Sequence, residues 1–143
     1  MSSESRLRLI ERIEASGMPR FGSPLPLVTL EEFFSGNDDF GSIGCNLSPL
    51  LGPRLFYEKL KEIRARSNVK DVLVEINEVV PEDSETWPFS DRVYIFTDAS
   101  HDEVSRWAAS LRPDTIEEGF ANGKHRQAPD FEPGVRTYAL WWD

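Results

Sequence analysis

The chain has 143 residues, of which 39% are hydrophobic and 29% charged, the length and composition of a single globular domain. It contains no apolar run near the roughly 18 residues of a membrane span, and its charged N-terminal segment lacks the apolar core of a secretion signal. A single cysteine, Cys45, excludes an intrachain disulfide and a cysteine-rich zinc site, so we expect a cytoplasmic protein.

The net charge of −9 is unevenly distributed along the chain. Residues 1–66 carry nine basic and nine acidic side chains, whereas residues 67–143 carry seven basic and sixteen acidic ones. Such a charge repels phosphate backbones and anionic membranes, so we expect no nucleic-acid or membrane partner. The expected partner is a protein with a basic surface or a second copy of the chain. The alternative is that the acidic residues only maintain solubility.

We predict one domain over residues 1–143, in which residues 1–36 form an N-terminal helical arm. Residues 5–16 are expected to be helical because three apolar residues lie on one face, at Leu9, Ile10 and Ile13. Residues 19–28 contain three prolines and a glycine, which is typical of an extended connector. A capping-box spacing at Thr29 and Glu32 predicts a second, short helix.

Residues 41–143 are predicted to form an α+β core. Its first strand is expected at residues 41–47, where apolar and polar residues alternate. A helix follows from Pro53 to about residue 66, and the second strand is expected at residues 69–80.

The second half of the core is predicted to begin with a polar loop at residues 81–90 and a third strand at residues 92–97, antiparallel to the second. Ser100 and Glu103 form another capping-box pattern, which predicts a helix to about residue 111. A loop at residues 114–134, rich in glycine, proline and charge, then leads to the last strand, which is expected at residues 135–142.

This order of elements predicts a ferredoxin-like βαββαβ arrangement, with a four-stranded antiparallel sheet. Right-handed crossovers would place both helices on one face of that sheet. The strand patterns predict which residues point to that face: Ile43, Cys45, Leu47, Val72, Val74, Ile76, Val93 and Ile95.

The opposite face of the sheet is the first candidate for a binding site. Strand alternation predicts that it carries Leu73, Glu75, Tyr94, Phe96, Arg136, Tyr138, Leu140 and Trp142. A sheet face with these aromatic rings is too apolar to remain exposed to water. Three covers are possible: the N-terminal arm, a second copy of the chain, or another protein.

The second candidate is the loop at residues 81–90, which combines acidic residues with Trp87 and Phe89, a mixture common at interface anchors. The alternative is that these two rings fold back and close one end of the core.

Catalytic and metal signatures are not evident in the sequence. Cys45 alternates with apolar neighbours and is expected to be buried in the core, unreactive as a nucleophile. His101 and His125 have no partner at metal-ligand spacing, so we predict no metal, no cofactor and no catalytic residue. Aromatic rings on an open sheet also suggest RNA binding, but the required basic residues are missing.

Two segments, WPFSDRVYI at residues 87–95 and YALWWD at residues 138–143, resemble small bacterial proteins of an uncharacterised family. The resemblance implies no site residues. Small acidic bacterial domains without catalytic residues are also similar, as a class, to the immunity proteins that neutralise toxins. We therefore expect a non-enzymatic protein-binding or regulatory domain.

The alternative function is a small-molecule-binding protein or enzyme. Its pocket would lie between the open sheet face and the N-terminal arm, with polar groups from Glu75, Tyr94, Arg136 and Tyr138.

Overall fold

A computed structural model describes residues 2–16, 25–121, 123–125 and 128–143. Its helices are α1 (Ser3–Ala15), α2 (Leu30–Phe34), α3 (Pro53–Arg64) and α4 (His101–Ala108), and α4 continues into a 3-10 turn, η1 (Ala109–Leu111). Its strands are β1 (Leu27–Thr29), β2 (Val69–Glu75), β3 (Arg92–Thr97), β4 (Thr115–Glu118) and β5 (Arg136–Trp141). The predicted α+β class is confirmed.

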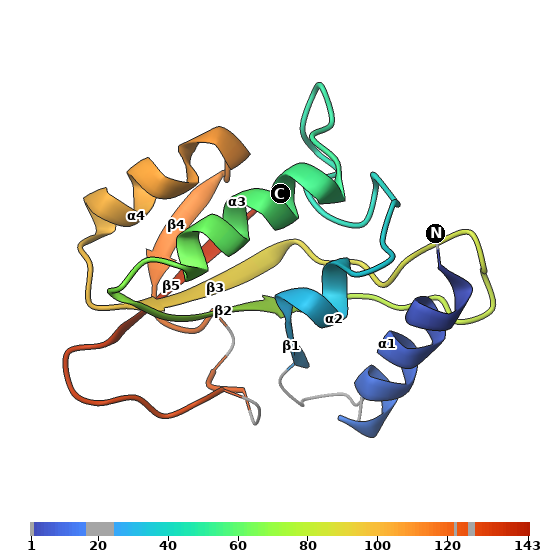
Figure 1. Cartoon of the computed structure of the whole chain (residues 1–143), viewed down its shortest axis with the longest axis horizontal. Helices are drawn as coiled ribbons and strands as arrows, with labels where there is room; N and C mark the ends of the chain where they lie inside the picture. The colour runs from blue at the N-terminus through green and yellow to red at the C-terminus, as the bar shows by residue number, and fades with distance from the viewer. Residues whose placement is uncertain (1, 17–24, 122, 126–127) are drawn as a thin grey trace.

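The five strands form one antiparallel sheet in the order β1-β2-β3-β5-β4. Helices α3 and α4 lie against one face of the sheet, which we call the inner face (Figure 1). The connection between β4 and β5 passes below the opposite side, which we call the outer face (Figure 1). None of the described helices is long and apolar enough to cross a lipid bilayer.

The predicted helices form where the sequence places their caps. The Thr29 side chain accepts a hydrogen bond from the Glu32 amide, and the Glu32 carboxylate accepts one from the Thr29 amide, which completes a capping box at α2. Ser100 caps α4 by accepting from the Glu103 amide. Pro53 occupies the first turn of α3, where its missing N–H costs no hydrogen bond.

The predicted four-stranded βαββαβ arrangement is not observed, because residues 41–47 do not form a strand. Gly44 has φ +65°, a left-handed conformation that ends any extended segment, and a Cβ there would lie 2.6 Å from the Phe56 ring. Only Ile43 makes an isolated bridge, to Ser90. The prediction for Cys45 is therefore also wrong: the thiol is exposed.

Two short strands that were not predicted occupy the edges of the sheet. β1 pairs with β2 at the end of the predicted connector, whose residues 19–24 lie outside the described residues. β4 pairs with β5 and lies within the predicted long loop. Strands of three and four residues show almost no periodicity, so their formation depends on a neighbouring strand that offers hydrogen bonds.

The inner face holds the main apolar core. Phe56, Leu60 and Ile63 of α3 are buried there, as the helical spacing predicts. The N-terminal arm joins the same core through buried Leu9, Ile13, Phe33 and Phe34. The described helices of the arm, α1 and α2, therefore pack with the inner core and not against the outer face.

The predicted orientation of the last strand is wrong. Tyr138, Leu140 and Trp142 point to the inner face, and Ala139 points to the outer one. The prediction took Arg136 as a marker of the open face. Arg136 in fact lies on the inner face, and its side chain reaches solvent because it is at the start of β5. The polar tips of the two aromatic residues find backbone acceptors in the core: the Tyr138 hydroxyl donates to the Ala99 carbonyl at 2.8 Å, and Trp142 Nε1 donates to the Leu111 carbonyl at 2.8 Å.

Candidate functional site

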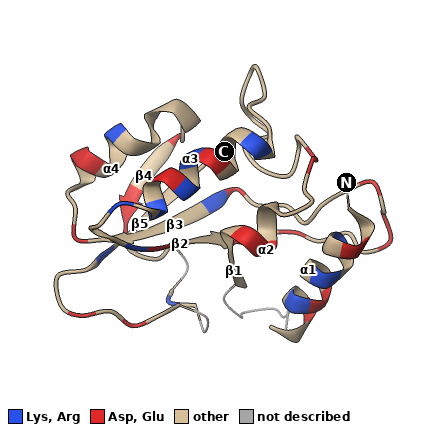
Figure 2. Cartoon of the chain, in the orientation of Figure 1, with Lys and Arg blue, Asp and Glu red and all other residues tan. Residues whose placement is uncertain are grey.

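The first candidate site is the acidic loop, which we define as residues 80–86 between β2 and β3. Its acidic residues Glu82, Asp83 and Glu85 are exposed, and none of them makes an ion pair with a described residue. The loop lies beside the N-terminus of α1 and appears red in Figure 2. It therefore presents three free negative charges to solvent.

Arg6 of α1 holds the backbone of the acidic loop in place. Its side chain is only 4% exposed and donates hydrogen bonds to four loop carbonyls: Thr86 O at 2.6 Å, Asp83 O at 2.7 Å, Val80 O at 3.1 Å and Pro81 O at 3.4 Å. A guanidinium has five N–H donors in a fixed plane, so it can bind several carbonyls at once. The positive charge below the loop also offsets the repulsion among its carboxylates.

The two aromatic residues that follow the acidic loop are not surface anchors in this structure. Trp87 is buried in the inner core, and its amide donates to the Asp39 carboxylate at 3.0 Å. Phe89 is half-buried and pairs through its backbone with Glu78. Trp87 thus closes one end of the core, as the alternative interpretation of the sequence expected. Its position also fixes one end of the acidic loop.

The second candidate site is the outer polar cluster, which we define as Glu75, Asn77, Arg92, Tyr94 and His125. Glu75 is fully buried, and its Oε1 lies 2.7 Å from His125 Nε2 and 3.5 Å from the Tyr94 hydroxyl. Its Oε2 accepts from the Asn77 amide at 3.1 Å and lies 3.5 Å from the Arg92 guanidinium. These partners make it possible to bury a carboxylate that would otherwise be strongly destabilising.

Tyr94 shows the effect of this burial on ionisation. Desolvation, together with the negative charge of Glu75, raises the pKa of Tyr94 to about 12. Its hydroxyl oxygen also accepts a hydrogen bond from the Ala121 amide at 3.3 Å. The phenol is therefore kept neutral and connects the sheet to the β4–β5 loop.

The outer face is covered by the chain itself, through the loop between β4 and β5. The Phe120 ring lies 5.3 Å from Tyr94 and 6.2 Å from Phe96, and the Phe131 ring lies 5.3 Å from Phe96. His125 from the same loop packs edge-on against Tyr94 at 5.2 Å. The cover observed among the described residues, the β4–β5 loop, was not one of the three that the sequence predicted.

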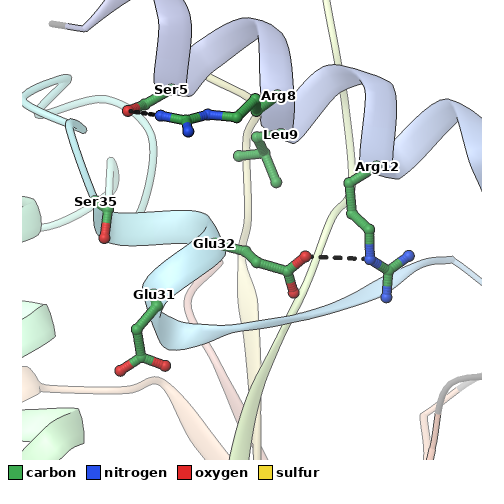
Figure 3. Close-up of a pocket in the computed structure, with 7 residues that line it drawn as sticks. All are labelled: Ser5, Arg8, Leu9, Arg12, Glu31, Glu32 and Ser35. Atoms are coloured by element: carbon green, nitrogen blue, oxygen red, sulfur yellow. Dashed lines mark hydrogen bonds and ion pairs between the residues drawn. The ribbon is translucent and has the colours of Figure 1, made fainter.

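Among the described residues, α1 and α2 of the arm pack with the inner core, so the ligand pocket predicted between the arm and the outer face does not form there. Instead, the arm contains a groove of about 400 Å³ between α1 and α2 (Figure 3). Arg12 crosses it to bind Glu32 at 3.1 Å, and Arg8 contacts the Ser5 hydroxyl at 3.5 Å. Glu31, the other acidic residue of the groove, pairs with Arg64 of α3 at 2.6 Å, so both carboxylates of the groove already have a cationic partner.

The predicted site residues are therefore divided among four places. Glu75, Tyr94 and Phe96 lie together on the outer face, as expected. Trp87, Tyr138 and Trp142 belong to the inner core, Phe89 lies next to the acidic loop, and Arg136 is exposed. The described residues contain no group of three or more histidine, cysteine or acidic side chains that could hold a metal ion.

Comparison with known proteins places the chain in a family. Residues 4–140 match the Uncharacterized protein YfbO family. The chain belongs to the YfbO family. It is 38% identical over 122 residues to Uncharacterized protein YfbO from Escherichia coli (strain K12), and the match covers 85% of each chain. No solved structure gives a significant match.

Two residues of the candidate sites in this YfbO-family chain were missed from the sequence. Arg6 lies on the apolar side of α1, because it is three positions before Leu9 and four positions before Ile10. An arginine within a buried stripe was a usable signal, because such a group needs partners inside the fold. His125 has no comparable signal, since it lies in a loop without periodicity.

Proposed function

We propose that this YfbO-family protein is a non-enzymatic binding domain that engages a basic protein partner through the acidic loop. The observation that carries the proposal is the set of four hydrogen bonds from buried Arg6 to the backbone of the loop. A loop whose backbone is already ordered loses little conformational entropy on binding, so its contacts contribute more to affinity.

The charge of the chain supports a basic partner. All of the net −9 comes from residues 67–143, which include the acidic loop. Such a field accelerates encounter with a cationic surface and disfavours acidic ones. A second copy would bring the same three carboxylates to the interface, so we favour a different protein over a homodimer.

The test compares three proteins in affinity capture from the host, at low and high salt. The loop variant carries Glu82→Gln, Asp83→Asn and Glu85→Gln. The asparagine keeps an oxygen that can accept the hydrogen bond from the Glu85 amide. The control carries Glu11→Gln, Glu14→Gln and Glu58→Gln, exposed positions outside the loop, and so has the same net charge.

We expect one basic protein that binds the wild type and the control, loses binding to the loop variant, and dissociates at high salt. Arg6→Lys should also weaken binding, because lysine keeps the charge but cannot hold four carbonyls in a fixed plane. The proposal would be contradicted if the loop variant and the control captured the partner equally. It would also be contradicted if the wild type were a dimer and the loop substitutions converted it to a monomer.

A further inference from the structure

A small cavity remains on the outer face beside the β4–β5 loop. It has a volume of about 170 Å³ and lies where β3, β5 and β4 are neighbours. Arg92, Trp141 and Thr115 are cross-strand partners in one row of this face, and Glu117 lies in the next row. Phe120 closes the cavity from the loop side.

Arg92 lines this cavity, and one of its donors is unused. Its side chain is 16% exposed, and its one ion pair is the long contact from Nη1 to Glu75 at 3.5 Å. Its Nε is buried and has no hydrogen-bond partner among the described residues. His125 and Asn77 also bind Glu75, so Arg92 shares this acceptor with two other groups. A guanidinium with free N–H groups at a cavity wall is suited to a carboxylate, which it can bind with two parallel hydrogen bonds.

A negative charge lines the same cavity. Glu117 is exposed and makes no ion pair with a described residue, whereas its neighbour Glu118 lies 4.0 Å from Arg136. The aromatic walls of the cavity come from Trp141 and Phe120. The Arg92 guanidinium lies 5.7 Å from the centre of the Trp141 ring. The cavity thus offers a cation, an anion and an apolar surface within one small volume.

We propose that this cavity binds a zwitterionic ligand the size of a small amino acid. Arg92 would hold the carboxylate and Glu117 the ammonium group, with the side chain of the ligand against Trp141 and Phe120. The volume limits the ligand: at about 30 Å³ per water molecule, 170 Å³ holds about six non-hydrogen atoms. Glycine, alanine and serine are of this size. The site is independent of the acidic loop and of the function proposed for it.

The first experiment measures binding of alanine to the whole protein by calorimetry and by the shift in Tm. Propionate and ethylamine are the matched probes, because each is alanine with one of its two charged groups removed. We expect alanine to bind at least tenfold more tightly than either probe. If propionate binds as tightly as alanine, the role of Glu117 is contradicted. If ethylamine binds as tightly as alanine, the role of Arg92 is contradicted. No binding of glycine, alanine or serine would overturn the proposal.

The second experiment uses two variants of the cavity and two controls. Arg92→Gln and Glu117→Gln should each weaken alanine binding at least tenfold, while Arg106→Gln and Glu58→Gln, which change charges outside the cavity, should not. Because Arg92→Gln also affects buried Glu75, the folded state is checked by circular dichroism. Glu117 is exposed, so its variant should fold normally, and unchanged alanine binding by that variant would overturn the proposal.

Discussion

The two faces of the sheet are covered by different means. On the inner face, α3 and α4 present apolar residues at helical spacing to the sheet, and the polar atoms of buried Tyr138 and Trp142 donate to backbone carbonyls. On the outer face, the irregular β4–β5 loop places Phe120 and Phe131 on the sheet and inserts His125 against buried Glu75. A loop without regular structure can therefore cover a sheet face when a buried polar group gives it a fixed attachment.

The difference has an energetic consequence. Each large apolar side chain fully buried on the inner face contributes about 1.5–3 kcal/mol to stability. Burial of Glu75 contributes little net stability, because the cost of removing its charge from water offsets much of the gain from its partners. The inner face therefore supplies most of the stability, whereas the outer cluster determines where the loop lies.

The largest expected effect is on the inner face. Phe56→Ala should lower the free energy of unfolding by about 3–5 kcal/mol, because it leaves a cavity where the ring packs at 5.2 Å from Trp142. Leu55→Ala is the matched control: its side chain is 52% exposed, and its loss should cost less than about 0.5 kcal/mol. Urea denaturation measures both. A small effect of Phe56→Ala would show that the inner face is not the main source of stability.

A somewhat smaller effect is expected on the outer face. Glu75→Ala should cost about 3 kcal/mol, since it leaves His125 and Arg92 without their buried acceptor. Glu75→Gln should cost less, because the amide oxygen still accepts hydrogen bonds. Limited proteolysis should cut the alanine variant faster than the wild type within residues 119–135. An alanine variant as stable and as resistant as the wild type would show that the cluster does not hold the loop.

The smallest effect is expected at high pH. Because the pKa of Tyr94 is raised from about 10 to about 12, the folded protein holds this proton after the unfolded chain has lost it. Stability that is present below pH 10 should therefore fall as the pH rises through that window. Ultraviolet absorbance should show one tyrosine that ionises late, and Tyr94→Phe should remove this step. If no tyrosine titrates above the ordinary range, the polar cluster is more hydrated than the structure indicates.

Long elements with a strong period could be predicted, and so could their caps. Helices α1, α3 and α4 and strands β2 and β3 appear where the sequence places them, and Glu75 and Tyr94 share a face as predicted. Alternation failed at residues 41–47, where the left-handed φ of Gly44 interrupts a pattern that looks like a strand. It failed again in β5, because Arg136 gave the wrong indication of which face is open.

The sequence by itself determined the α+β class, the acidic second half and the amphipathic helices of the inner face, since these depend on local spacing and composition. Only the tertiary structure decided what covers the outer face and what holds the acidic loop. Glu75 and His125 are 50 residues apart, and Arg6 and Thr86 are 80 apart. Contacts of this kind join single polar groups across the fold, and a single residue has no period from which its partner can be predicted.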